Sequence, residues 1–433
     1  MKVLDQLYAH FLKNGRIDTD SRKIQRNSIF FALKGEAFDG NLFAKKALES
    51  GASFAVVDDP KVADNPRCIL VDDVLFFLQQ FANYHRRQFD IPVISITGTN
   101  GKTTTKELIS SVLSQAFRVT FTQGNFNNHI GVPLTLLSIS KETEIAIIEM
   151  GANHMGEIAA LCRIAEPTMG LITNVGSAHL EGFGSFENVI KTKTEMYRYI
   201  KSVQGKVFVN QNNSILFPYT EKIDRIIYSS NEDHQAAVGG EVCNKIGNLQ
   251  LLLHLNKETQ LCKTNIVGNY NLENILAASC VANYLGLNLN QIVKGIESYV
   301  PQNNRSQLLK RNNHLIILDA YNANPVSMKA AVDNFFHQEY NRGLLILGDM
   351  KELGVESDLE HRKLLSEVSS KSNIDVFAVG PEMFKFRNEF FFEFFENVDD
   401  LITFLKDEYK FQNDLILVKG SRGIQLEKCI DNF

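Results

Sequence analysis

A glycine-rich loop between a predicted strand and a predicted helix is the feature that most constrains the fold. Val93–Thr97 is a β-branched, apolar run, which predicts a buried strand. Lys102–Ala116 has apolar residues at helical spacing and predicts an amphipathic helix. Gly98–Gly101 lies between them. This order of elements is the context that a phosphate-binding loop requires.

The residues of the loop fit that interpretation. Its glycines let backbone N–H groups turn toward phosphate oxygens, and the helix N-terminus adds the positive end of a dipole. We expect Lys102 to reach the β- and γ-phosphates and the Thr103 hydroxyl to bind Mg²⁺. The spacing departs from the usual G-x-x-x-x-G-K-[ST], since Ile96 stands where the first glycine is expected and Gly98 supplies the earlier turn. A chance glycine turn before a lysine is the alternative, which the flanking elements disfavour.

Strands and helices alternate along the rest of the chain, which predicts an α/β fold. Other strands are predicted at Ser28–Leu33, Phe54–Asp58, Glu144–Glu149, Gly170–Asn174, Lys206–Asn210, His314–Asp319, Leu344–Asp349, Asp375–Gly380 and Asp414–Gly420. A length of 433 residues predicts about three domains. We predict a small α/β domain over residues 1–88, a central parallel-sheet ATPase domain with the phosphate loop over 89–300, and a Rossmann-like α/β domain over 301–433.

Composition excludes several classes of protein. The formal net charge is −5, so the chain lacks the overall positive charge of a nucleic-acid-binding protein. Its six cysteines form no CxxC pair, which indicates buried cytosolic thiols and neither a disulfide frame nor a zinc site. The N-terminal segment is charged and no run of about 18 apolar residues occurs, so we expect no signal peptide and no membrane insertion. We predict a cytoplasmic protein.

Polar residues follow the predicted strands, where ligands bind in sheets of this type. Glu149 ends one strand and is a candidate Mg²⁺ ligand, although a solvated strand-end acid is the alternative. His179 follows another strand, and a lone histidine is more often a hydrogen-bonded core residue. Lys191 and Lys193 lie on a predicted helix, where a surface position is the default.

Two further groups of amides are candidates for binding a polar substrate. Asn125, Asn127 and Asn128 offer donors and acceptors, with an asparagine-rich turn as an equally good interpretation. In the C-terminal third, three loops follow strands and should share one rim of the sheet: residues 319–325, 348–354 and 419–423. Tyr321, Asn322 and Asn324 lie in the first of these loops. Tyr321 could stack on a base or pack on a peptide, and the asparagines could bind amides.

These motifs together resemble the Mur ligase family, essentially from end to end. Thr97–Glu107 resembles the family's TGTNGKT loop, Glu149 its strand-end Mg²⁺ acid and His179 its second metal-site residue. Gly268–Ala278 resembles the helix start that meets the base, with Tyr270 in place of the usual histidine. The resemblance implies ATP and Mg²⁺ as cofactors. It implies these ATP-binding residues: Gly98, Thr99, Asn100, Gly101, Lys102, Thr103, Thr104, Asn271, Asn274 and Arg305.

The resemblance also implies the remaining site residues. The segments around Ser21 and Arg22 and over residues 32–40 resemble those that hold the UDP-sugar. In several Mur ligases a lysine at about the position of Lys193 is carbamylated by CO₂ and helps to bind Mg²⁺, whereas Lys191 is out of register. The implied catalytic residues are Lys102, Glu149, His179 and Lys193, and the implied metal ligands are Thr103, Glu149, His179 and carbamylated Lys193.

Three motifs resemble those of the family member that adds a D-Ala-D-Ala dipeptide: DAYNANP (319–325), GDMKELG (348–354) and KGSRG (419–423). The member that adds the third residue has a DNPR motif in its third domain, and here those letters occur only at residues 64–67. The implied activity is ATP-dependent amide ligation to UDP-N-acetylmuramoyl (UDP-MurNAc) tripeptide through an acyl phosphate, for peptidoglycan synthesis, by a monomer. The alternatives are the third-residue-adding ligase, a folylpolyglutamate-synthetase-like ligase, or a nucleotide-gated binding protein.

Overall fold

The computed structural model describes residues 2–176, 180–230, 235–244 and 246–433, which form two compact units. The first unit comprises residues up to 95, 118–151 and 157–168. The second comprises 96–117, 152–156 and the chain from 169 onward. Strand β7 (Val93–Thr97) contributes residues to both.

The first unit contains a parallel sheet in the order β1-β2-β5-β6, with α2 packed against it. Strands β8 and β9 of the same unit pair in parallel. The Arg86 side chain, near the end of α3, donates hydrogen bonds to the carbonyls of Ala165 and Phe89. The helices and strands of this unit are α1 (Lys2–Asn14), β1 (Ile17–Asp18), β2 (Ile29–Phe31), β3 (Lys34–Gly35), β4 (Phe38–Asp39), η1 (Gly40–Phe43), α2 (Ala44–Glu49), β5 (Phe54–Val57), η2 (Pro60–Val62), β6 (Cys68–Leu70), α3 (Val74–Arg86), β8 (Val119–Phe121), α5 (Gly131–Leu136), β9 (Ile145–Glu149) and α6 (Glu157–Ala165).

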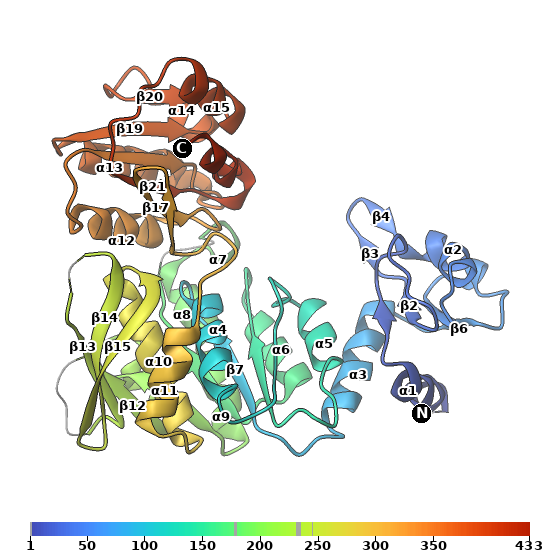
Figure 1. Cartoon of the computed structure of the whole chain (residues 1–433). Helices are drawn as coiled ribbons and strands as arrows, with labels where there is room; N and C mark the ends of the chain where they lie inside the picture. The colour runs from blue at the N-terminus through green and yellow to red at the C-terminus, as the bar shows by residue number, and fades with distance from the viewer. Residues whose placement is uncertain (1, 177–179, 231–234, 245) are drawn as a thin grey trace. The chain divides into compact units, whose positions relative to one another are not determined.

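The second unit contains the phosphate-loop helix α4 (Lys102–Leu113), with helices α10 and α11 packed against it (Figure 1). Strands β10, β11, β12 and β13 pair in parallel. The elements of this region are β10 (Met169–Ile172), α7 (Leu180–Phe183), α8 (Phe186–Lys193), α9 (Glu195–Ser202), β11 (Lys206–Asn210), η3 (Phe217–Thr220), β12 (Asp224–Ser229), β13 (Val238–Val242), β14 (Asn248–Leu255), β15 (Glu258–Val267), η4 (Asn269–Asn271), α10 (Leu272–Tyr284) and α11 (Leu289–Ser298).

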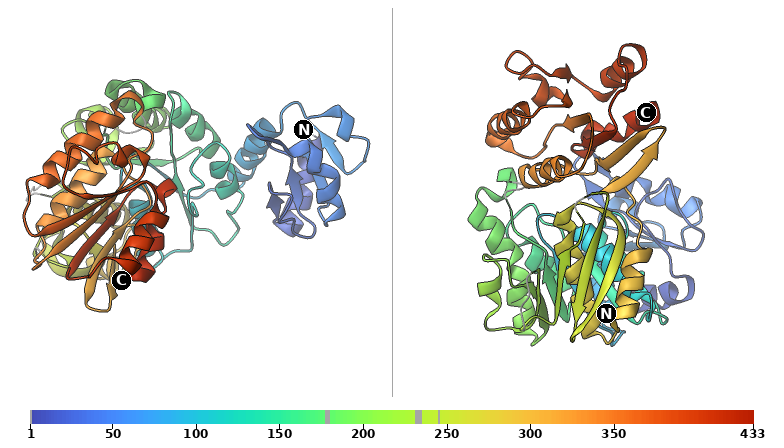
Figure 2. Two further views of the ribbon diagram at one scale, coloured as in Figure 1. Left: turned by 90° about the horizontal axis from the view of Figure 1, so that it is seen from above. Right: turned by 60° about the vertical axis from the view of Figure 1, so that its left-hand side comes forward.

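The parallel pairing predicted for the central sheet is present from β10 to β13, but one edge of the sheet is antiparallel. Strands β13, β14 and β15 pair antiparallel, and the β14–β15 hairpin lies beside α11 (Figure 2). Residues of β14 alternate between half-buried and buried positions along Asn248–Leu255. This alternation is typical of a strand with one covered face, and a hairpin needs no crossover helix.

The C-terminal part of the second unit is a six-stranded sheet in the order β16-β17-β21-β18-β19-β20. Leu345 and Leu347 of β18 pack with α12 and α13 on one face, whereas Leu344 and Ile346 pack with α15 on the other (Figure 2). Five of these strands are parallel, as predicted for a Rossmann-like domain. The elements are β16 (Gln307–Arg311), β17 (His314–Asp319), α12 (Pro325–Phe336), β18 (Gly343–Gly348), η5 (Gly354–Glu356), α13 (Ser357–Ser369), β19 (Ile374–Val379), α14 (Pro381–Phe384), β20 (Glu393–Phe395), α15 (Val398–Asp407), β21 (Leu415–Lys419), η6 (Arg422–Ile424) and η7 (Leu426–Asn432).

Every strand predicted from the sequence is present, with its ends within two residues of the expected positions. The expectation that all cysteines are buried is wrong, because Cys243 is exposed and Cys68 is half-buried, although all six are free thiols. None of the described helices combines the length and apolar character that a bilayer crossing needs.

Candidate active site

The phosphate loop turns sharply between β7 and α4, and its glycines make the turn possible. Gly98 has φ of 146° and Gly101 has φ of 77°, both in the left-handed region. A Cβ atom on Gly98 would lie 2.0 Å from Thr173 Oγ1, and one on Gly101 would lie 2.5 Å from Asn274 Oδ1. Any side chain at either position would therefore displace the residues that hold the loop.

The end of β10 holds this loop through residues that the sequence analysis missed. Thr173 Oγ1 donates to the Asn100 carbonyl at 2.6 Å, and Asn174 Nδ2 donates to the same carbonyl at 3.1 Å. Asn174 Oδ1 accepts from the Asn100 backbone N–H at 2.9 Å. Thr99 is fixed by Gly176, whose N–H donates to the Thr99 hydroxyl at 3.0 Å. Their position at the carboxyl end of a predicted strand, or just past it, was the available signal.

Lys102 begins α4 and folds back over the loop. Its Nζ donates to the carbonyls of Gly98 at 2.8 Å and Thr99 at 2.9 Å. Thr103 is buried and Thr104 is half-buried in the first turn of the same helix. The ammonium group thus lies over the loop where the motif requires a cation for phosphate.

Asn274 of α10, which belongs to the Gly268–Ala278 motif, contacts the phosphate-loop helix α4. Its Oδ1 accepts from the Thr105 hydroxyl at 3.0 Å, and its Nδ2 donates to Asn271 Oδ1 at 2.9 Å. Asn271 in turn donates to the Val267 carbonyl. Tyr270 has its hydroxyl 3.0 Å from Ser306 Oγ, and burial raises the pKa of this phenol. Both asparagines therefore make bonds inside the protein, close to the loop.

The DAYNANP segment contacts the phosphate loop directly. Asn324 Nδ2 donates to Asn100 Oδ1 at 2.8 Å. The same Asn324 side chain caps helix α12, because its Oδ1 accepts from the Ser327 N–H at 2.9 Å. Asn324 is 5% exposed, so this contact is shielded from water. Of the candidate substrate-binding residues in this segment, the structure brings Asn324 to the loop, while the Asn322 side chain accepts from the neighbouring Ala323 N–H.

Tyr321 lies close to two cations. The Arg305 guanidinium is 3.6 Å from the centre of its ring and that of Arg422 is 5.2 Å away. Arg305 Nε is buried and has no hydrogen-bond partner among the described residues, so the ring is the contact that orients this guanidinium. The sequence predicts a base or a peptide, and not an arginine, as the group stacked on Tyr321.

A buried ion pair supports the same rim. Lys419 Nζ lies 2.6 Å from Asp319 Oδ2, and Lys419 is 1% exposed. The Ser421 N–H donates to the Asp349 carbonyl at 3.0 Å, and the Lys351 N–H donates to the Ser421 hydroxyl at 3.0 Å. These bonds join the loops after β17, β18 and β21, so the prediction that they share one rim is confirmed.

In the first unit, Glu149 is a buried carboxylate at the end of β9, with 1% of the residue exposed. Its Oε1 accepts from Asn127 Nδ2 at 2.8 Å. Asn128 lies just before α5, where its Oδ1 accepts from the N–H groups of Ile130 and Gly131, and Asn125 is exposed. Of the three candidate asparagines, the structure thus places Asn127 beside the candidate metal ligand and gives Asn128 a local structural contact.

The predicted UDP-sugar residues lie in an exposed turn of the first unit. Arg22 donates through Nε and Nη2 to the two carboxylate oxygens of Asp20, at 2.9 and 2.8 Å. This contact lowers the pKa of Asp20 to about 2. Ser21 stands between them and is half-buried.

The surface position expected by default for both lysines of α8 holds for Lys191 and is wrong for Lys193. Lys193 is 3% exposed and its Nζ lies 5.7 Å from the centre of the Phe183 ring, whereas Lys191 is exposed. Glu195, at the start of α9, accepts from the Gly156 N–H at 2.9 Å. His179 lies outside the described residues. Among those described, no three His, Cys, Asp or Glu side chains are grouped closely enough to hold a metal ion.

Known proteins resemble this chain over nearly its full length. Three family descriptions match: the Mur ligase family catalytic domain over residues 15–86, the Mur ligase middle domain over 96–282 and the Mur ligase glutamate ligase domain over 304–422. UDP-N-acetylmuramoyl-tripeptide–D-alanyl-D-alanine ligases from Bacillus subtilis and Escherichia coli are each 34% identical to the chain, over 96% of it and 92% of the relative. The chain belongs to the Mur ligase family.

Solved structures of other Mur ligases have the same fold. A crystal structure of MurF from Acinetobacter baumannii has a TM-score of 0.86 at 31% identity, and covers 96% of this chain and 92% of that one. MurF from Thermotoga maritima in complex with ADP has a TM-score of 0.85 at 26% identity, over 96% of both chains. The predicted three-region α/β fold is therefore that of a Mur ligase.

Proposed function

We propose that this Mur ligase is a UDP-MurNAc-tripeptide–D-alanyl-D-alanine ligase, which uses ATP to complete the pentapeptide precursor of peptidoglycan. The observation that supports this best is the Asn324–Asn100 contact, because it joins the dipeptide-type DAYNANP segment to the phosphate loop. Relatives that carry this activity in their names match the chain over nearly its full length. The proposal includes a cytoplasmic location and a monomer.

The proposed reaction has two steps and needs no protein nucleophile. A carboxylate oxygen of the tripeptide attacks the γ-phosphorus of ATP, and ADP leaves to give an acyl phosphate. The amine of D-Ala-D-Ala then attacks the acyl carbon, inorganic phosphate leaves, and the amine loses a proton as the amide forms. The loop N–H groups, Lys102 and Arg305 would stabilise the charge on the transferred phosphoryl group, and the protein would mainly align the reactants.

Mg²⁺ would supply a divalent charge that neutralises phosphate oxygens. We propose Thr103, Glu149, His179 and Lys193 as its ligands. The buried Thr103 hydroxyl and Glu149 carboxylate are the hard oxygen donors that Mg²⁺ prefers. Lys193 would serve as a carbamate, formed when its neutral amine adds to CO₂ and releases a proton. Lys193 is buried beside Phe183, and a carbamate there would avoid the repulsion between a free ammonium and a bound metal ion.

We propose further that residues 1–88 bind the UDP-sugar, 89–300 bind ATP and 301–433 bind the dipeptide and part of the nucleotide. Ser21 and Arg22 would contact the UDP end. Asn125, Asn127 and Asn128 would contact the peptide. Tyr321, Asn322 and Asn324 would contact the acceptor side, while Asn271 and Asn274 would support the nucleotide from α10.

The test is ligation itself. Purified protein with ATP, Mg²⁺, UDP-MurNAc-tripeptide and D-Ala-D-Ala should release ADP only when both substrates are present. Lys102→Ala should lower this rate by about 10²–10³-fold or more while the protein stays folded, because it removes a cation from the transferred phosphoryl group. A variant that releases ADP at the parent rate would contradict the assignment of the phosphate loop.

A further inference from the structure

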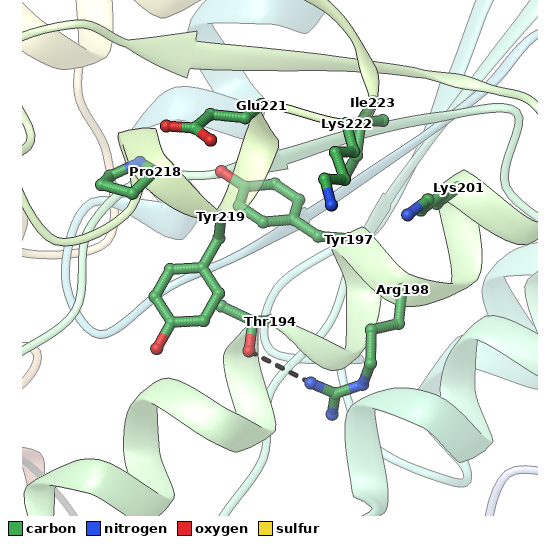
Figure 3. Close-up of a pocket in the computed structure, with 9 residues that line it drawn as sticks. All are labelled: Thr194, Tyr197, Arg198, Lys201, Pro218, Tyr219, Glu221, Lys222 and Ile223. Atoms are coloured by element: carbon green, nitrogen blue, oxygen red, sulfur yellow. Dashed lines mark hydrogen bonds between the residues drawn. The ribbon is translucent and has the colours of Figure 1, made fainter.

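A pocket lies in the second unit, on residues that the proposed reaction does not use. It has a volume of about 230 Å³ and lies between α9 and the stretch formed by η3 and the residues that connect it to β12. Figure 3 shows the residues that form its wall: Thr194, Tyr197, Arg198, Lys201, Pro218, Tyr219, Glu221, Lys222 and Ile223. None of them belongs to the phosphate loop or to the rim of the C-terminal sheet.

The wall of this pocket is positively charged. It contains three cations, Arg198, Lys201 and Lys222, and one carboxylate, Glu221, so its formal charge is +3 − 1 = +2. The whole chain has a net charge of −5, so the pocket is a local exception. Among the described residues, the side chains of Lys201 and Lys222 form neither a hydrogen bond nor an ion pair. Lys201 lies in the last turn of α9, where a cation interacts favourably with the helix dipole. Lys222 lies outside this helix, so the dipole does not explain why a cation is placed there.

A buried tyrosine hydroxyl provides a second, independent observation. Tyr197 is 2% exposed, and its hydroxyl has no hydrogen-bond partner among the described residues. Burial raises the pKa of this phenol, so it keeps its proton at neutral pH. A buried hydroxyl without a partner destabilises the fold, and buried polar groups are nearly always satisfied. A ligand oxygen that accepts from this hydroxyl would satisfy it.

Helical spacing brings these groups to one face. Thr194, Tyr197, Arg198 and Lys201 are at positions i, i+3, i+4 and i+7, which lie on the same face of a helix. Arg198 is held in place by its hydrogen bonds to Thr194 Oγ1 and to the Lys191 carbonyl. The guanidinium is therefore positioned before any ligand binds, while the two ammonium groups remain available.

We propose that this pocket is a binding site for a small phosphate-bearing anion, separate from the ATP site. Compact ammonium charges and one fixed guanidinium suit a phosphate group. The volume is below the range of about 300–1,000 Å³ that is typical for drug-sized ligands, so a nucleotide is too large and a phosphate ion or a small phosphate monoester fits. Salt should weaken the binding, because the cations are exposed.

The experiment measures binding calorimetrically, with inorganic phosphate and with glycerol 3-phosphate as probes. The enzyme is first saturated with Mg²⁺ and a non-hydrolysable ATP analogue, so that phosphate cannot occupy the loop. Lys201→Ala/Lys222→Ala should weaken binding of the probes at least about tenfold. Lys263→Ala/Lys294→Ala is the matched control, since both of its lysines are exposed and lie outside the pocket, and it should bind as the parent does.

Tyr197→Phe separates a binding role from a structural one. It should raise the midpoint of thermal unfolding in phosphate-free buffer, because it removes a buried hydroxyl without a partner, and it should also weaken phosphate binding about tenfold. Tighter binding of one probe would identify the source as free phosphate or as a monoester. The proposal is overturned if the parent binds neither probe, or if the Lys201/Lys222 double variant binds like the control. Neither result would bear on the ligase reaction, which is tested separately by ADP release.

Discussion

Replacement of Asn324 should affect two measurable properties by separate routes. In Asn324→Ala the α12 cap is lost, which costs about 1 kcal/mol of stability. The hydrogen bond to Asn100 is lost as well, and a neutral hydrogen bond contributes about 1 kcal/mol. If both losses of free energy weakened ATP binding, their sum of about 2 kcal/mol would raise the KM for ATP about thirtyfold. We expect only the Asn100 part, about fivefold, to appear in the KM for ATP.

Asn324→Ser is the matched control for the cap. Serine is a good N-cap residue, but its side chain is too short to reach Asn100. It should therefore be about 1 kcal/mol more stable than Asn324→Ala, because it keeps the cap, and show the same roughly fivefold rise in the KM for ATP. Thermal unfolding and steady-state kinetics with each substrate varied in turn measure the two effects. The reasoning is refuted if Asn324→Ser leaves the KM for ATP unchanged, or if the KM for the UDP-substrate rises most.

Two other predictions concern buried lysines. Lys193→Ala should lose most ligase activity, measured by ADP release, and regain part of it with added acetate, which supplies the missing carboxylate oxygens. The control Lys191→Ala changes an exposed lysine and should match the parent. A fully active Lys193→Ala would exclude the carbamate. Lys419→Met should destabilise the protein by about 3 kcal/mol, because it leaves the partly buried Asp319 carboxylate without its cation, and Asp319→Asn added to it should recover most of the loss. Urea unfolding measures this, and a stable single variant would contradict it.

The sequence predicted the fold well because strands, helices and the glycine loop leave local signals. The rim of the C-terminal sheet was also predictable, since the carboxyl ends of parallel strands share an edge whatever their order. The Lys419–Asp319 pair was not predictable, because it depends on β21 lying next to β17, and the two residues are far apart in the chain. In contrast, the alternation along Asn248–Leu255 was visible in the sequence and was missed.

Side-chain bonds that hold the loop were beyond sequence reasoning for a similar reason. Thr173 and Asn174 contact Asn100 only because β10 ends beside the phosphate loop. The Asn324–Asn100 bond likewise joins residues from different regions of the chain. The sequence identifies the motif residues, but only the structure shows the hydrogen bonds between them.

The central claim is that this enzyme adds D-Ala-D-Ala to UDP-MurNAc-tripeptide, and mass spectrometry of the ligation product tests it most directly. Incubation with ATP, Mg²⁺ and both substrates should convert the UDP-substrate to a species heavier by the dipeptide less one water, with one ADP and one phosphate released per product. A free diamino acid offered with UDP-MurNAc-dipeptide should give no product. Turnover of the diamino acid equal to that of the dipeptide, or ADP release without a heavier UDP-product, would contradict the account.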